Sequence, residues 1–84
     1  MPVVVEIHNV GHQNLQREVV ALVEQVLSCR TGDWRVLIVG SVEGDRWEME
    51  ISGPNSFERS YTLEKAAGEH VPQRIAALVS RIVS

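Results

Sequence analysis

Hydrophobic and polar positions alternate with a period of two in the middle of the chain, which predicts β-strands there. Trp47, Met49 and Ile51 alternate with charged residues, so this strand has one apolar and one polar face. The preceding stretch, residues 36–39, is aliphatic without a break. We therefore expect a hairpin whose first strand is apolar on both faces and whose second strand is apolar on only one.

The turn of this hairpin decides which residues lie opposite one another. A two-residue loop at Gly44-Asp45 is favoured, because glycine at the first loop position suits a type II′ turn. Glu43 then faces Arg46, which pairs opposite charges across the strands. The same register predicts three further pairs, namely Val42 with Trp47, Gly40 with Met49, and Ile38 with Ile51.

The first helical pattern begins at Leu15, where the hydrophobic period changes to that of an amphipathic helix. Asn14 is the expected N-cap, and Gly32 is expected to take the left-handed position after the last turn. The apolar face of this helix comprises Leu15, Val19, Leu22, Val23 and Val26.

The second helical pattern begins near Pro72, since proline is tolerated in the first turn of a helix. Its apolar face comprises Val71, Ile75, Leu78, Val79 and Ile82. The segment before it, residues 64–70, is ambiguous, and one helical turn over residues 64–67 broken at Gly68 is one interpretation.

Two further strands complete the predicted sheet. Residues 3–7 are rich in valine and predict a strand, and residues 57–63 predict another after a Pro54-Asn55-Ser56 loop. The chain, residues 1–84, is then a single small α+β domain with the order β-α-β-β-β-α. We expect a two-layer sandwich, in which both helices pack on one face of a four-stranded, mainly antiparallel sheet. The first strand is expected to run parallel to the second, giving the strand order 1-2-3-4.

The composition of the chain argues against several classes of protein. The chain has 84 residues, a formal net charge of −3 and one cysteine, Cys29, which rules out an internal disulfide and argues against a small secreted scaffold. No apolar run approaches the length needed to span a bilayer, and no signal-peptide pattern follows Met1. We therefore expect a cytoplasmic location, and the preference for arginine over lysine indicates a bacterial source.

Candidate chemistry is sparse. His8, His12 and Cys29 lack a convincing fourth ligand for zinc, so we expect neither a metal nor a cofactor. Glu48 and Glu50 share one strand face, but carboxylates on an open face with arginines nearby are typical of a solvated surface. No nucleophile motif is present, and a non-enzymatic role is favoured.

The leading functional hypothesis follows from the aliphatic run in the second strand. If the helices cover Val36 and Ile38, then Leu37 and Val39 lie on the open sheet face, with Val4 of the first strand beside them. This partner-binding hypothesis comprises an apolar patch and its polar rim: Val4, Leu37, Val39, Arg35, Glu48 and Glu50. An apolar centre with a polar rim is typical of an interface, so we expect a protein partner or a homodimer.

Two alternatives remain. One is a small-molecule-binding or accessory enzyme domain with a site near the loop from His8 to His12. The other is a nucleic-acid binder, because residues 15–83 share the order α-β-β-β-α with the double-stranded-RNA-binding domain. Residues 64–69 contain one lysine between two glutamates, where such a domain needs several cations for phosphate, so charge disfavours this alternative.

Overall fold

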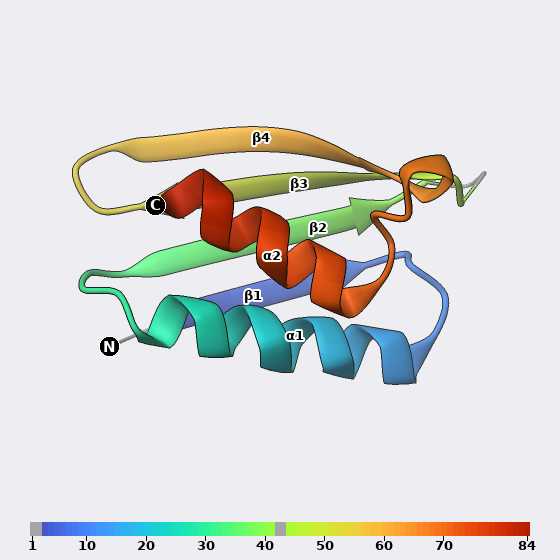
Figure 1. Ribbon diagram of the computed structural model, residues 1–84, viewed down its shortest axis with the longest axis horizontal. Helices are drawn as coiled ribbons and strands as arrows, with labels where there is room; N and C mark the ends of the chain where they lie inside the picture. Colours follow the sequence, from blue (N-terminus) through green and yellow to red (C-terminus); the bar gives the residue numbers. More distant parts are fainter. Residues whose placement is uncertain (1–2, 42–43) are drawn as a thin grey trace.

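The computed structural model describes residues 3–41 and 44–84 and confirms the expected fold class. In chain order the elements are β1 (Val3–His8), α1 (Gln13–Ser28), β2 (Trp34–Gly40), β3 (Arg46–Gly53), β4 (Phe57–Glu64), a short 3₁₀ helix (Lys65–Ala67) and α2 (Pro72–Val83). Both helices lie on the same face of one four-stranded sheet (Figure 1). The result is a two-layer α+β sandwich.

The sheet has the predicted strand order β1-β2-β3-β4. β1 is parallel to β2, because the chain returns through α1 before β2 begins, and the other two pairs are antiparallel. The sheet is therefore mixed. The three-residue loop Pro54-Asn55-Ser56 joins β3 to β4 as predicted, and it places Met49 opposite Tyr61 and Trp47 opposite Leu63.

The predicted register of the β2–β3 hairpin is wrong by two residues. Trp47 lies opposite Gly40 rather than Val42, and Met49 lies opposite Ile38 rather than Gly40. This register puts the bulkiest side chain of β3 opposite the residue that has none, so that Trp47 and Met49 are both buried. A shift of two keeps every side chain on its predicted face, because side chains alternate with a period of two.

The loop of this hairpin is consequently longer than two residues. The N–H of Gly44 donates to the backbone carbonyl of Ser41 at 3.1 Å, and Arg46 pairs with Glu64 of β4. The expected partners Val42 and Glu43 lie outside the described residues.

The expected ends of α1, with Asn14 as its N-cap and Gly32 directly after its last turn, are both wrong. α1 begins at Gln13 after His12, two residues before Leu15, because the N–H of Gln16 already donates to the His12 carbonyl at 3.0 Å. α1 ends at Ser28, and Gly32 adopts its positive φ of 101° in the following loop, packed against Pro54.

α2 starts at Pro72 as predicted, but Val71 is its N-cap and is 50% exposed rather than part of the apolar face. One 3₁₀ turn, Lys65–Ala67, precedes it and ends at Gly68 with a φ of 74°.

The core lies between the helices and the covered face of the sheet. The residues that are fully buried come from both layers: Val19, Val23, Leu27, Val36, Ile38, Leu63, Ile75 and Val79. Val10, in the loop between β1 and α1, is also buried, although no periodic pattern marks it. Gly40 is needed here, because a Cβ at this position would overlap the backbone carbonyl oxygen of Asn9.

Neither α1 nor α2, within the described residues, combines the length and apolar character that crossing a bilayer requires.

Candidate protein-interaction surface

The open face of the sheet carries the side chains that the sequence singled out. Leu37 and Val39 of β2 face away from the helices and are half-buried, whereas Val36 and Ile38 of the same strand are fully buried. Val4 of β1 also lies on the open face and is 45% exposed. Arg35, Glu48 and Glu50 are exposed on the same face, so the structure brings the predicted set onto one surface.

Within this surface the apolar patch is divided. The parallel register places Val4 level with Arg35, and Glu6 level with Leu37. The Arg35 guanidinium donates to a carboxylate oxygen of Glu6 at 2.7 Å, so this ion pair runs diagonally between Val4 and Leu37. Leu37 and Val39 therefore form a short aliphatic stripe, and Val4 stands apart from it.

Acidic side chains flank the aliphatic stripe on both sides. Leu37 lies between Glu6 of β1 and Glu50 of β3, and Val39 lies between His8 and Glu48. By strand alternation, the charged residues of the open face are Glu6, Arg35, Arg46, Glu48, Glu50, Glu58 and Glu64. Among the described residues, two arginines and five glutamates thus lie on the open face. They give this face a formal net charge of −3, the same as that of the whole chain.

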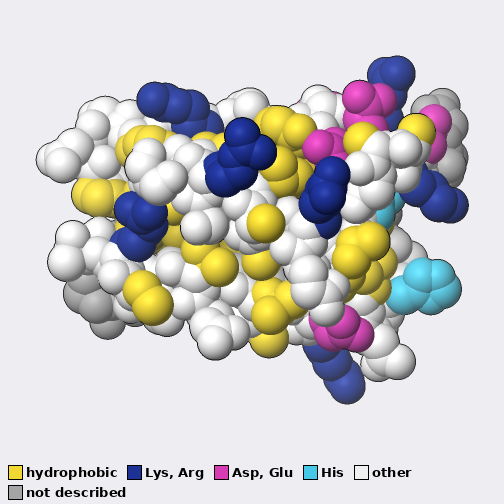
Figure 2. All heavy atoms as spheres, in the orientation of Figure 1, with side chains coloured by type: hydrophobic (Ala, Val, Ile, Leu, Met, Phe, Trp, Pro, Cys, Tyr) yellow, Lys and Arg dark blue, Asp and Glu magenta, His cyan; other side chains and the backbone are white. Residues whose placement is uncertain are grey.

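The helical face is different in character. Figure 2 shows Lys and Arg side chains scattered across it, with hydrophobic side chains visible between them. Arg17 of α1 and Arg74 and Arg81 of α2 are exposed there, together with acidic residues such as Glu18 and Glu24. The two sides of this small domain therefore present different charge to a partner.

Glu6 is the open-face carboxylate with the most defined environment. The hydrogen bond from Arg35 lowers the pKa of Glu6 below its ordinary value, and the weaker contact with His8 at 3.5 Å acts in the same direction. Glu6 is therefore ionised at neutral pH and adds to the negative potential beside Leu37.

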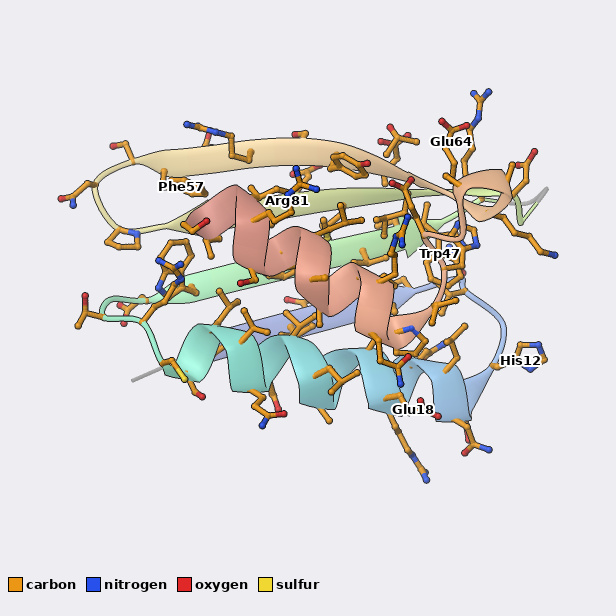
Figure 3. All side chains as sticks on the ribbon, viewed as in Figure 1. His12, Glu18, Trp47, Phe57, Glu64 and Arg81 are labelled. Carbon is orange, nitrogen blue, oxygen red and sulfur yellow. The ribbon has the colours of Figure 1, made fainter. Side chains whose placement is uncertain are left out.

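The structure does not bring the candidate metal ligands together. His8 lies on the open face beside Glu6, whereas His12 precedes α1 and points away from the body of the domain (Figure 3). The thiol of Cys29 lies at the other end of α1. In residues 3–41 and 44–84, no three His, Cys, Asp or Glu side chains converge on one point. The absence of a metal or cofactor stays a prediction.

An open hollow of about 390 Å³ lies between α1 and the end of β1, near the loop from His8 to His12. Its lining is Ile7, Gln13, Gln16, Arg17, Val20, Ala21 and Glu24. No histidine takes part, so the histidines that motivated the small-molecule hypothesis do not form this site.

A cluster at the end of β4 was missed by sequence reasoning. The Tyr61 hydroxyl donates to a Glu69 carboxylate oxygen at 2.5 Å, and the other oxygen of Glu69 accepts the N–H of Glu64 at 2.9 Å. These bonds lower the pKa of Glu69, and the same carboxylate raises the pKa of Tyr61. Tyr61 is thereby held protonated, which makes it a hydrogen-bond donor and a poor nucleophile.

His70 completes this end of the molecule. Its ring stacks on buried Trp47 with ring centroids 3.8 Å apart, and its Nε2 atom lies 2.9 Å from the Leu63 carbonyl oxygen. The cluster therefore ties the segment before α2 to the sheet. The cluster depends on a contact between Tyr61 and Glu69, which are eight residues apart. A single sequence carries no signal of such a contact.

These features define a two-layer α+β domain with an uncovered, acidic sheet face. No protein family and no curated protein sequence matches the chain. Among solved structures, the chain is similar to the crystal structure of the Thermus thermophilus Protein Y N-terminal domain, with a TM-score of 0.61. That similarity covers 96% of this chain and 98% of the other at 18% sequence identity, so it shows the fold alone.

Proposed function

We propose that this chain is a non-enzymatic protein-interaction domain whose open sheet face docks a protein partner rich in lysine and arginine. The observation that carries the proposal is the aliphatic stripe of Leu37 and Val39 set between glutamates on both neighbouring strands. An apolar centre excludes water from a contact, while a charged surround orients the partner and speeds its association.

The size of the stripe limits the affinity. Burying one aliphatic side chain contributes about 1.5–3 kcal/mol, and Leu37 and Val39 are already half-buried in the free domain. The contact is therefore weak and dependent on salt, because exposed charges are screened over about 10 Å at 0.1 M ionic strength.

The charge also discriminates between partners. Nucleic acid and anionic membrane are repelled by a face with a formal net charge of −3, and a second copy docking through the same face would bring five glutamates against five. A cationic protein surface is the partner that this face fits. The cytoplasmic location and bacterial source expected from the sequence stay predictions.

The proposal is tested by titrating the isotope-labelled domain with a short synthetic peptide of alternating lysine and valine, followed by backbone amide NMR. The expected result is a set of shift changes centred on the amides of Leu37, Val39, Glu48 and Glu50 that weaken as salt is raised.

A pair of variants with equal charge change provides the control. Glu48→Lys/Glu50→Lys reverses the sign of the charge on the open face and should weaken binding of the peptide at least tenfold. Glu18→Lys/Glu24→Lys makes the same change on exposed positions of α1 and should leave the peptide bound. Shift changes confined to the helical face, or equal weakening by both double variants, would contradict the proposal.

A further inference from the structure

β4 is an edge strand with unpaired backbone groups. Within the described part of the chain it pairs only with β3. The N–H of Lys65 donates to the Asp45 carbonyl at 3.0 Å, so the odd-numbered residues of β4 point their backbone groups at β3. In an antiparallel ladder the even-numbered residues then point theirs outward. The outward backbone groups of Glu64 are bonded to Glu69: the Glu64 N–H donates to the Glu69 carboxylate at 2.9 Å, and the Glu64 carbonyl accepts from the Glu69 N–H at 3.1 Å.

The outward groups farther along β4 are open. The carbonyl of Glu58 accepts a hydrogen bond only from the neighbouring Arg59 side chain, at 2.7 Å, and the backbone groups of Ser60 and Thr62 make no outward bond among the described residues. An exposed edge of this kind is a template for another strand.

The helix layer does not cover this edge. Figure 1 shows β4 as the outermost strand, beyond α2. Of the β4 side chains that face the helices, Leu63 is buried, Phe57 and Tyr61 are half-buried and Arg59 is exposed. This contrasts with β2, where the side chains that face the helices, at positions 34, 36 and 38, are all buried.

Because the helices do not cover the edge of β4, a shallow apolar hollow lies between β4 and α2. Its volume is about 350 Å³, and Tyr61 of β4 and Leu78, Arg81 and Ile82 of α2 line it. Figure 3 shows Phe57 and Arg81 along the same margin between α2 and β4. A strand added to β4 would therefore meet both unpaired backbone and unburied aromatic surface.

We propose that this edge binds a second copy of the same chain, with the two β4 strands antiparallel about a two-fold axis at Ser60. The two sheets then become one continuous sheet, held by about six new backbone hydrogen bonds between Glu58, Ser60 and Thr62 and their counterparts. Phe57 and Tyr61 of each copy are buried against the other.

The charges along β4 select this register. Centred on Ser60, the pairing sets Glu58 opposite Thr62 and Arg59 opposite Tyr61, with no like charges facing each other. Centring on Arg59 would set arginine against arginine, and centring on Tyr61 would set Glu58 against Glu64. Intermediate registers would set even-numbered residues of one copy opposite odd-numbered residues of the other, whose backbone groups point at β3, so the hydrogen bonds could not form.

Arg59 gains a complementary environment across the two-fold axis. In the single domain it lies over the Phe57 ring, with its guanidinium carbon 4.7 Å from the ring centroid. In the dimer it faces Tyr61 of the second copy, whose hydroxyl binds the Glu69 carboxylate. The Tyr61 ring and that carboxylate together are suited to a guanidinium.

This interface is separate from the proposed docking of a cationic partner on the open face. The side chains that contact across the two-fold axis on the helical side are Phe57, Arg59 and Tyr61, whereas Leu37 and Val39 lie on the open face of β2, which the dimer does not cover. The two proposals can therefore fail independently.

The experiment is sedimentation equilibrium of the full chain over a range of protein concentrations. The expected result is a mass that rises to that of a dimer. Ser60→Pro removes the N–H at the two-fold axis without removing a bond to β3, and should be monomeric with an unchanged circular dichroism spectrum. Ser60→Ala keeps the N–H and is the matched control, which should dimerise like the parent.

A covalent test reports the register. On a Cys29→Ser background, Ser60→Cys should form a disulfide between copies under air oxidation, since hydrogen-bonded antiparallel pairs have Cα atoms about 5.5 Å apart. In this step two thiols are oxidised to one disulfide and oxygen takes up the two electrons and two protons. Ser52→Cys on the same background lies on β3 and should not cross-link.

Three outcomes would overturn the dimer. These are a parent chain that stays monomeric at the highest concentration tested, a dimer that Ser60→Pro leaves intact, and cross-linking at Ser52→Cys as efficient as at Ser60→Cys. None of them bears on peptide binding to the open face.

Discussion

Val36 and Ile38 face the helices and are fully buried, whereas Leu37 and Val39, equally apolar and on the same strand, face the other way and remain half-buried. The two pairs differ in what lies above them. α1 and α2 cover one face of β2, and only neighbouring side chains such as Glu6 and Glu50 flank the other. An aliphatic run therefore marks a central strand, while the position of the helices decides which half of the run becomes core.

The largest effect expected from this comparison is at Ile38. Ile38→Ala should lower the free energy of unfolding by about 2–5 kcal/mol, because it removes a fully buried side chain and leaves a cavity. Leu37→Ala, one residue away, should cost about 1 kcal/mol. Urea denaturation of the two variants measures both, and equal losses would show that the faces are not distinguished by packing.

The next effect concerns space on the covered face. Gly40→Ala should cost about 1–3 kcal/mol, because its Cβ would meet the Asn9 carbonyl oxygen and the backbone must move. Gly44 is the comparison, since nothing lies within 4 Å of a Cβ there and only its φ of 77° opposes a side chain. Gly44→Ala should therefore cost about 1 kcal/mol. A Gly40→Ala loss no greater than that of Gly44→Ala would mean that the loop after β1 adjusts freely.

The open face can be tested by charge. Leu37→Glu should leave the domain folded but less stable by about 1 kcal/mol, because the new carboxylate lies opposite Glu6 and Glu50. Leu37→Lys places a cation between the same two glutamates and should be the more stable of the two variants. Circular dichroism and urea denaturation distinguish them. Global unfolding of Leu37→Glu would place this residue in the core.

The smallest effect is on the acid side of the pH profile. Arg35 lowers the pKa of Glu6 in the folded state, so the ion pair stabilises the fold above the unfolded-state pKa and is lost as the pH falls through the lower, folded-state pKa. Arg35→Gln should return the Glu6 pKa towards its ordinary value, measured by carbon NMR of the side-chain carboxyl group.

Arg46→Gln is the control for this titration. Arg46 also lies on the open face, 3.7 Å from Glu64, and makes no contact with Glu6. It should leave the Glu6 pKa unchanged. A shift of equal size in both variants would mean that general surface potential, rather than the hydrogen bond from Arg35, sets the Glu6 pKa.

Much of the fold could be predicted because periodicity is a local property. The covered face of β3 could be predicted from the alternation of Trp47, Met49 and Ile51 with charged residues. The buried stripe of α1 could be predicted from the spacing of Val19 and Val23. The loop at Pro54-Asn55-Ser56 and the start of α2 at Pro72 were also predictable, since proline restricts the backbone wherever it stands. The predicted members of the open-face surface follow from the same alternation.

What the sequence could not determine depends on contacts between distant segments. The β2–β3 register is set by the packing of Trp47 opposite Gly40. The start of α1 is set by a backbone hydrogen bond to His12 rather than by the N-cap propensity of Asn14. The division of the apolar patch by the ion pair of Glu6 and Arg35 required the parallel register of β1 and β2.

The alternation of apolar and polar residues follows from the sequence alone, and it predicts that the central strands are apolar on at least one face. The apolar stripes of the two helices also predict that both pack on one face. How far the helices reach across that face depends on tertiary contacts, which leave the edge of β4 beyond the cover of α2 and set Leu37 and Val39 among glutamates. Alternation is enforced by the geometry of a single strand, whereas burial and charge clustering depend on elements that the chain brings together only on folding.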